Sequence, residues 1–144
     1  MIQTSEQYQH IVQGCREIFL KKTIDYGTSW RIARASSLTD QIFIKANRIR
    51  TIQETGENKV GESIEGEFGA MVNYCIMAII QIRSNDGFGL ELSEQEALKL
   101  YNQVAQEAFE LMERKNHDYG EAWRDMRVSS LTDMILIKLF RIKK

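Results

Sequence analysis

Apolar residues recur at intervals of three and four along most of this chain, with polar residues between them. The stretch after position 36 holds one such stripe, made by Leu38, Ile42, Ile49 and Ile52. This spacing predicts an amphipathic helix, because positions three and four apart share one helix face. The chain contains no proline and has few runs of β-branched residues. The pattern predicts an all-α protein, a helical bundle that forms a single domain over residues 1–144.

End signals divide this pattern into separate helices. Ser93 and Glu96 have the spacing of a capping box, and Gly27 follows a periodic segment where a helix stop is expected. Ser37 is expected to cap the following helix, with Asp40 in its first turn. We therefore expect helices over residues 5–22 and 93–115, after residue 36 and after residue 129, and over the apolar run 68–82.

One phrase occurs twice in the chain. Residues 25–40 read DYGTSWRIARASSLTD, and residues 118–133 read DYGEAWRDMRVSSLTD. An offset of 93 aligns residues 8–51 with residues 101–144 without a gap, and twenty of the 44 aligned positions are identical. Self-similarity of this length predicts an internal duplication.

The two repeat units are unequal. Unit one covers residues 1–82, and unit two covers residues 93–144 and ends before any equivalent of residues 52–82. Either the chain was shortened or one unit lost its last helix, and the uncapped end of unit two favours a missing tail. Two such units are expected to pair about a pseudo-twofold axis, and the protein is expected to form a homo-oligomer.

Charge is balanced overall but unevenly distributed. The formal net charge of −1 does not indicate a DNA-binding protein. Residues 21–51 carry seven Lys and Arg against two acids, residues 114–144 carry eight against four, and residues 52–113 carry three against twelve. A basic motif beside an acidic helix suits a phosphate ligand carried by a divalent cation, and it equally suits oppositely charged surfaces that pack together.

Composition indicates a cytoplasmic protein without a membrane span. The longest apolar run is shorter than the about twenty residues that cross a bilayer, and the N-terminal residues lack the layout of a signal peptide. Cys15 and Cys75 have no metal-binding or redox spacing, which predicts reduced structural thiols.

A lysine and an arginine break the apolar pattern after position 36. Lys45 lies inside the stripe and Arg48 follows three residues later, and Lys138 and Arg141 repeat this placement. Lysine is rarely buried without a partner. The pair is therefore a candidate for binding phosphate or ordering a carboxylate, or else its side chains pack their stems and extend to water.

The repeated phrase supplies an acid and two aromatic residues in each copy. Asp25 and Asp118 are candidates for binding a metal, a base or a sugar, or are turn residues that bond the nearby backbone. The aromatic candidates for stacking on a nucleobase are Tyr26, Trp30, Tyr119 and Trp123, which otherwise belong to the core. Arg31 and Arg124 are expected to brace the acids of SSLTD.

The acidic middle segment is the candidate metal site. Glu62 and Glu65 are three residues apart, so they are neighbours on one helix face. Two carboxylates could hold Mg²⁺, which also binds substrate phosphates, or they favour the start of a solvated helix. The chain has no Ser-His-Asp pattern and no phosphate-binding glycine motif.

These motifs together resemble a known family. The phrases K-x-x-DYG-x-x-W, SSLTD-x-I-x-IK-x-x-RI, V-x-ES-I-E and NY-x-I-x-x-I are similar to the nucleotide modification associated domain 1 family. The resemblance implies an all-helical fold and a link to modified nucleotides in phages and bacteria. A more distant similarity to MazG-like nucleotide pyrophosphatases implies a carboxylate cluster that holds Mg²⁺, with Glu62 and Glu65 at the matching positions. Aspartates often found four and eight residues after Glu62 are replaced here by Gly66 and Ala70.

Three functions follow from these observations. The first is a Mg²⁺-dependent nucleoside triphosphate pyrophosphohydrolase, in which Glu62 and Glu65 bind metal and a metal-bound hydroxide attacks phosphorus. The second is a non-catalytic nucleotide-binding module associated with nucleotide or DNA modification. The third is a structural helical bundle that binds another protein.

Overall fold

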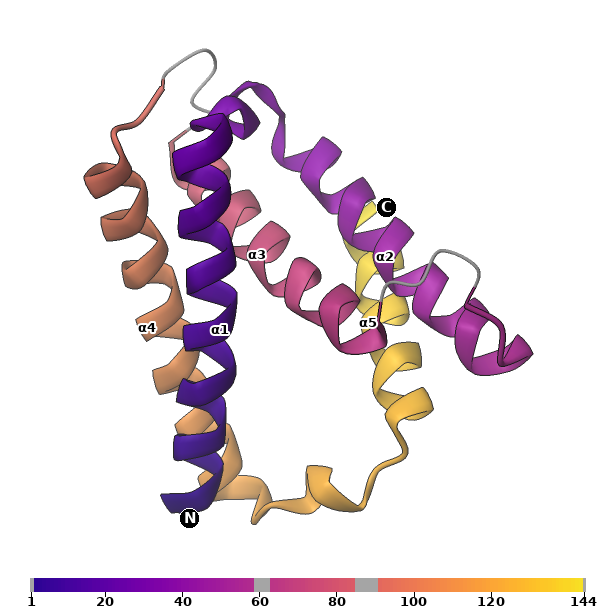
Figure 1. Cartoon of the computed structure of the whole chain (residues 1–144). Coiled ribbons are helices and arrows are strands. Elements are labelled where there is room, and N and C mark those ends of the chain that lie inside the picture. Colours follow the sequence, from indigo (N-terminus) through magenta and orange to yellow (C-terminus); the bar gives the residue numbers. More distant parts are fainter. Residues whose placement is uncertain (1, 59–62, 85–90, 144) are drawn as a thin grey trace.

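The computed structural model describes residues 2–58, 63–84 and 91–143. This part of the chain is all-α, as the periodicity predicts, and it forms a five-helix bundle (Figure 1). The elements in chain order are α1 (Ile2–Tyr26), the 3-10 turn η1 (Ser29–Ile32), α2 (Ala35–Thr55), α3 (Ile64–Arg83), α4 (Glu94–Tyr119), the 3-10 turn η3 (Ala122–Asp125) and α5 (Val128–Lys143). None of the described helices is both long and apolar enough to cross a membrane.

Both copies of the phrase fold in the same way, as a helix end, a 3-10 turn and a helix start. Gly27 and Gly120 follow the last residues of α1 and α4 with φ angles of 69° and 61°. Their amides donate to the carbonyls of Thr23 and Asn116 at 2.8 and 2.9 Å. A left-handed residue at this position suits glycine, so the predicted stop at Gly27 is confirmed.

Two predicted helix starts have different outcomes. Ser93 caps α4, and its side chain and that of Glu96 form the expected capping box. Ser37 does not cap α2, because the helix begins at Ala35 and Arg34 is its N-cap residue, without a side-chain hydrogen bond. The amide of Ser37 already donates to the carbonyl of Arg34 at 3.0 Å, as a residue inside the first turn does.

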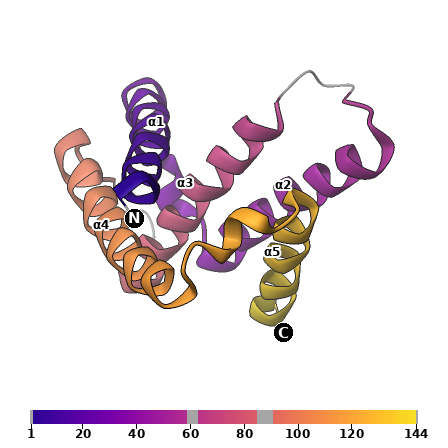
Figure 2. The same cartoon turned by 90° about the horizontal axis from the view of Figure 1, so that it is seen from below.

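The two helices that flank the first copy of the phrase each pack against the corresponding helix that flanks the second copy. α1 contacts α4, and α2 contacts α5. α3, which has no counterpart among the described helices, lies against α2 and also contacts α4 and α1 (Figures 1 and 2). Two apolar clusters result: Val12, Phe19, Ile76, Ile80, Ala97, Tyr101, Val104 and Ala105 form the first, and Ile42, Ala46, Ile49, Met71, Leu136 and Leu139 form the second.

Buried polar contacts fix the position of α3. The side-chain amide of Asn73 donates to the carbonyl of Cys15 at 3.0 Å, and its oxygen accepts from the hydroxyl of Tyr101 at 2.7 Å. These bonds satisfy polar groups that would otherwise be costly inside the bundle. They also connect α3 to α1 and α4 at one level.

Arg31 holds the other end of α3. Its buried guanidinium donates to Gln81 at 2.8 Å and to Ser84 at 2.9 Å. The expectation that Arg31 braces Asp40 is wrong, because η1 turns the arginine toward the C-terminal end of α3. Asp40 instead forms an ion pair with Lys143 of α5 at 3.5 Å.

Candidate functional site

A cavity of about 580 Å³ lies where α1, η1, α2 and α3 meet, and we name it the α3 cavity. This volume is in the range of small-molecule sites. Its wall combines cations, aromatic rings and polar groups from segments far apart in sequence. The residues of these kinds are Phe19, Lys22, Thr23, Tyr26, Ser29, Trp30, Lys45, Ser63, Glu67, Asn73 and Tyr74.

Glu67 is the buried acid of this cavity. Its side chain is 3% exposed, and its Oε1 atom lies 3.0 Å from Nη1 of Arg48 and 3.5 Å from Nζ of Lys45. Glu67 comes from the first turn of α3, and the two cations come from α2. The ammonium of Lys45 faces a buried carboxylate across the helix interface, which explains why a lysine can occupy this apolar stripe.

Two buried polar atoms in the wall have no hydrogen-bond partner among the described residues. They are Nε1 of Trp30, a donor, and Oε2 of Glu67, an acceptor. Each buried group left without a partner costs about 1–3 kcal/mol, so buried polar groups are normally satisfied by protein, water or ligand. Both atoms belong to residues that line the α3 cavity.

The structure brings only part of the predicted first-copy site to this cavity. Tyr26 lines the cavity with a largely exposed ring. Asp25 and Glu65 are exposed and do not belong to the lining. Glu62 lies outside the described residues.

The second copy of the phrase borders a larger groove. The open groove, as we name it, has a volume of about 1300 Å³ and lies between α1, α4, η3 and α5. Tyr119 and Trp123 line it, whereas Asp118, Lys138 and Arg141 are exposed outside it. The two copies of the phrase therefore have different surroundings, and their backbones also differ before the 3-10 turn, where Thr28 has a φ of −111° and Glu121 a φ of 69°.

Glu121 does not line the open groove itself but forms hydrogen bonds with three residues that do, Thr4, Asn116 and Arg124. Its carboxylate accepts from the Thr4 hydroxyl at 2.6 Å, from Asn116 at 3.1 Å and from Arg124 at 2.9 Å. The Thr4 hydrogen bond, followed by those from Asn116 and Arg124, lowers the pKa of Glu121 to about 2. A carboxylate held in its ionised form here joins the start of α1 to η3.

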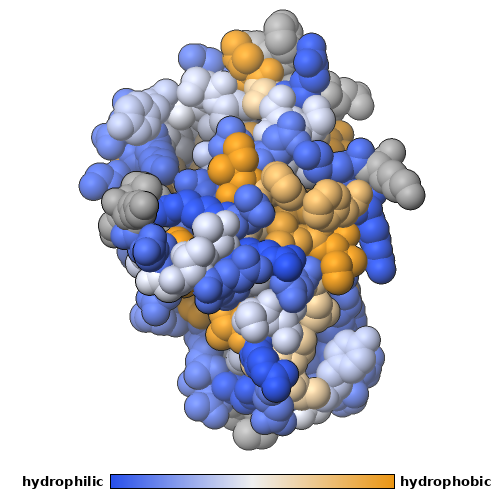
Figure 3. Space-filling view, turned by 90° about the vertical axis from the view of Figure 1, so that its right-hand side faces the viewer, coloured by the Kyte–Doolittle hydropathy of each residue, from blue (hydrophilic) through white to orange (hydrophobic). Residues whose placement is uncertain are grey.

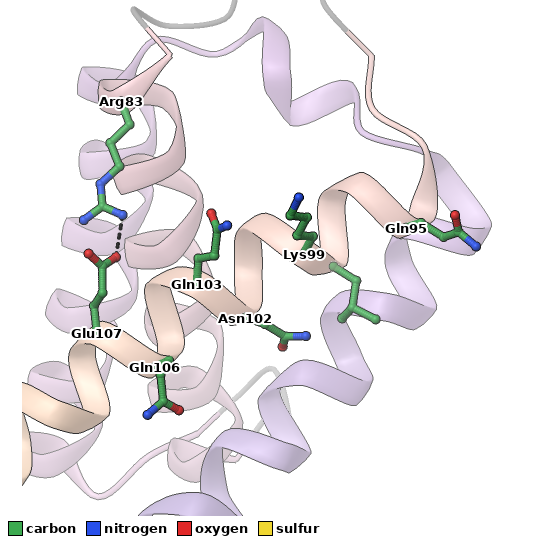
Figure 4. Close-up of a pocket in the computed structure, with 8 residues that line it drawn as sticks. Arg83, Gln95, Lys99, Asn102, Gln103, Gln106 and Glu107 are labelled. Atoms are coloured by element: carbon green, nitrogen blue, oxygen red, sulfur yellow. Dashed lines mark hydrogen bonds and ion pairs between the residues drawn. The ribbon is translucent and has the colours of Figure 1, made fainter.

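A third cavity lies on the side of α4 that faces the end of α3 (Figure 4). Arg83 and Glu107 point toward one another and form an ion pair at its edge. Its other labelled side chains are exposed amides and one lysine from α4, namely Gln95, Lys99, Asn102, Gln103 and Gln106. It contains none of the predicted site residues and no aromatic ring.

The described residues contain no group of three His, Cys, Asp or Glu side chains placed to hold a metal ion. Within the α3 cavity the acid is Glu67, and two cations already approach it. The geometry of the described part of the site thus suits a ligand with hydrogen-bond donors and an anionic group.

Glu67 and Lys22 are the site residues that sequence reasoning missed. Glu67 is three residues after Ile64 and four before Met71, so it occupies an apolar stripe, as Lys45 does. Two opposite charges inside two apolar stripes are a signal for a buried ion pair. Lys22 gave a weaker signal, because a lysine near a helix end also suits the helix dipole.

A model of the family described as nucleotide modification associated domain 1 matches residues 22–82 and 115–144. The chain belongs to this family. The first matched segment contains Lys22, Trp30, Lys45 and Glu67 of the α3 cavity, and the second contains the repeated phrase of unit two. The protein is therefore a domain associated with nucleotide modification. No curated protein and no solved structure matched the chain.

Proposed function

We propose that this domain binds a nucleotide in the α3 cavity. The observation that carries the proposal is a single cavity that combines the aromatic residues Tyr26 and Trp30 with Lys22, Lys45 and the carboxylate of Glu67. A nucleobase or ribose offers N–H or O–H donors to the carboxylate and acceptors to the indole. Its phosphate offers negative charge to the two lysines.

The proposed roles follow from the position of each side chain. Trp30 and Tyr26 offer aromatic faces to the base, and the exposure of Tyr26 leaves its ring available to a ligand. Lys22, at the exposed side of α1, meets the phosphate. Arg48 does not line the cavity, but its ion pair with Glu67 positions the carboxylate.

Hydrolysis is the second candidate, and one feature favours it. The first turn of α3 carries Glu67, which lies beside Lys45 in the cavity wall, and Glu65, which is exposed outside the wall, so a nucleotide in the cavity would have an acid near its phosphates. The more distant resemblance to MazG-like pyrophosphatases supports Mg²⁺ at this helix start. In this proposal Glu62 and Glu65 hold the ion, and the domain releases pyrophosphate.

The family match in two segments supports the proposal that the two units arose by duplication. The contacts of α1 with α4 and of α2 with α5 agree with two units paired about a pseudo-twofold axis. In this proposal only unit one carries the wall provided by α3, so it holds the complete nucleotide site.

The test is a binding panel of nucleosides and nucleoside mono-, di- and triphosphates, including modified bases, with and without Mg²⁺. We expect saturable binding that weakens about tenfold in Lys22→Ala for phosphorylated ligands only, since a lost charge-assisted bond costs about 1.4 kcal/mol or more. Trp30→Phe is expected to weaken nucleosides and nucleotides alike. Lys115→Ala changes the corresponding lysine of unit two and is the matched control.

The same reactions are assayed for released pyrophosphate. Saturable binding without product supports a binding module, and Mg²⁺-dependent product that disappears in Glu65→Gln supports the hydrolase. Binding by no member of the panel, or equal losses in Lys22→Ala and Lys115→Ala, would refute a nucleotide site in the α3 cavity.

A further inference from the structure

The two copies of the repeated phrase line two different cavities with equivalent side chains. Eight residues between the second half of α1 and η1 line the α3 cavity, and an offset of 93 gives the counterpart of each in α4, η3 or the turn between them. Seven of these eight counterparts line the open groove. The pairs with polar or aromatic character include Lys22 and Lys115, Tyr26 and Tyr119, and Trp30 and Trp123. The open groove thus repeats one wall of the α3 cavity.

The tryptophan of the open groove is held in place by its neighbours. Nε1 of Trp123 donates to Oδ1 of Asn116 at 3.0 Å, and the guanidinium of Arg124 lies over the indole ring at 4.5 Å from its centre. Arg124 is itself paired with Glu121 at 2.9 Å. A ring that is fixed in this way does not have to be ordered by a ligand, and this lowers the cost of binding.

The rest of the wall differs between the two cavities. In the α3 cavity it comes from α2 and α3 and holds Lys45 and the buried carboxylate of Glu67. In the open groove it comes largely from α1, which contributes Tyr8 and Ile11. Lys138, the counterpart of Lys45, lies outside the groove. The groove therefore keeps the aromatic rings and one lysine of the α3 cavity but not its second lysine.

The charges at the open groove balance one another. Lys115 and Arg124 are the cations of its wall, Glu6 is an acid of the same wall, and Glu121 supplies a second negative charge next to Arg124. Leucine, isoleucine and methionine side chains make up much of the remaining surface. A phosphate in such a groove would lose hydration without a surplus of positive charge to offset the cost. An uncharged ligand does not meet this cost.

Exposed apolar residues alone do not distinguish this site. Figure 3 looks onto the side of the molecule formed by α2 and α5, where apolar side chains gather near the middle of the face. α5 exposes Ile137 and Phe140, and neither residue lines the open groove or the α3 cavity. What distinguishes the groove is a pair of aromatic rings and a lysine at positions that repeat those of the α3 cavity.

We propose that the open groove is a second ligand site and takes an uncharged nucleoside, with the base against Trp123 and Tyr119. The choice of a nucleoside rests on the proposed function, because the groove repeats the side chains that meet the base in the α3 cavity. Aromatic side chains stack on any base through its π face. Glu6 and His10 are exposed groups of the groove wall and offer hydrogen bonds to ribose hydroxyls.

The fluorescence of Trp123 tests this inference. In a Trp30→Phe background Trp123 is the sole tryptophan of the chain, and it lines the open groove. The full chain is titrated with adenosine, guanosine, cytidine and thymidine, and with their 5′-monophosphates. We expect a saturable change of emission with a nucleoside. Its monophosphate is expected to bind with an affinity within about threefold, because the groove offers the phosphate no net positive charge.

Three glutamate variants locate the binding. Ile11→Glu is expected to weaken the nucleoside about tenfold or more, because Ile11 lines the groove and the base would have to displace water from the new carboxylate. Ile24→Glu is the matched control, since Ile24 is 58% exposed on α1, close to the 61% of Ile11, and lines neither cavity. Ile137→Glu checks for unspecific binding to exposed apolar surface. Circular dichroism of each variant checks that the bundle is intact.

The outcome also separates this inference from the proposed function. Trp30, measured in a Trp123→Phe background, reports on the α3 cavity. A response of Trp30 without a response of Trp123 would overturn the second site and leave the α3 cavity as a nucleotide site, and silence of both tryptophans would overturn both proposals. A Trp123 response that Ile11→Glu leaves unchanged, or that either control variant weakens equally, would overturn the site in the groove. A monophosphate that binds about tenfold more tightly than its nucleoside would overturn the assignment to an uncharged ligand.

Discussion

The buried carboxylate of Glu67 allows a stability experiment with an internal control. Replacing Lys45 and Arg48 together with methionine keeps the aliphatic stems on α2 and removes both charges that face Glu67. The corresponding double replacement of Lys138 and Arg141 removes two cations that have no described acidic partner. Both variants lose the same side chains and the same net charge, and they differ chiefly in the contacts with Glu67, beside a hydrogen bond from Arg48 to the exposed Asn58 at 3.0 Å.

The expected magnitude follows from the distances and the burial. At N–O separations of 3.0 and 3.5 Å, each pair attracts by roughly 5 kcal/mol at an effective dielectric constant of about 20, before desolvation is subtracted. Removing the partners of a buried charge costs about 3–5 kcal/mol. Lys45 and Arg48 are 26% and 22% exposed, and water screening reduces the cost to about 2–4 kcal/mol.

Urea unfolding followed by circular dichroism measures this cost. We expect the Lys45/Arg48 variant to lose about 2–4 kcal/mol, which lowers the melting temperature by roughly 5–15 °C for a domain of this size. The Lys138/Arg141 variant is expected to stay within about 0.5 kcal/mol of the unmodified protein. Equal stabilities of the two variants would show that the ion pairs with Glu67 do not hold α3 on α2.

Three further predictions concern other parts of the fold. Arg31→Met leaves acceptors at the end of α3 unsatisfied and is expected to cost about 1–3 kcal/mol in urea unfolding, whereas Arg124→Met changes a more exposed arginine and is expected to cost less. Gly27→Ala is expected to destabilise the protein by about 1–2 kcal/mol, because Gly27 has a left-handed φ. Gly14→Ala, inside α1 and with open space around the added methyl, is expected to stabilise the protein by about 0.5–1 kcal/mol. A stabilising Gly27→Ala or a destabilising Gly14→Ala would contradict this backbone geometry. Glu121→Gln is expected to melt at a lower temperature than the unmodified protein above about pH 4.5, and this gap should close as the pH falls toward the folded-state pKa of about 2, because protonation then removes the same charge. A gap that does not depend on pH would contradict the lowered pKa.

The helices and their ends were largely predictable because they depend on local residues. The apolar spacing gave the all-α class, and Gly27 and the capping box of Ser93 gave element ends that the structure confirms. The start of α2 was not predictable in this way. Ser37 is a good capping residue, but η1 positions the chain so that the helix begins at Ala35.

The site was predictable only where a charged residue interrupted the apolar stripe of its helix. Lys45 stood out because a charge within an apolar stripe requires an explanation, and the structure supplies Glu67 as its partner. The sequence placed Asp25 and Trp30 in one phrase, yet only Trp30 lines the α3 cavity. Which face of a short turn points inward depends on the helices packed around it, and that information is spread over α1, α2 and α3.

Trp30 offers the sharpest measurement of nucleotide binding. In a Trp123→Phe background Trp30 is the sole tryptophan of the chain, and it lines the α3 cavity with an unsatisfied indole N–H. We predict that its emission changes saturably as a nucleotide is added and that Lys22→Ala shifts the midpoint about tenfold to higher concentration. Trp30 emission that stays unchanged across the whole nucleotide panel, with and without Mg²⁺, would contradict nucleotide binding in this cavity.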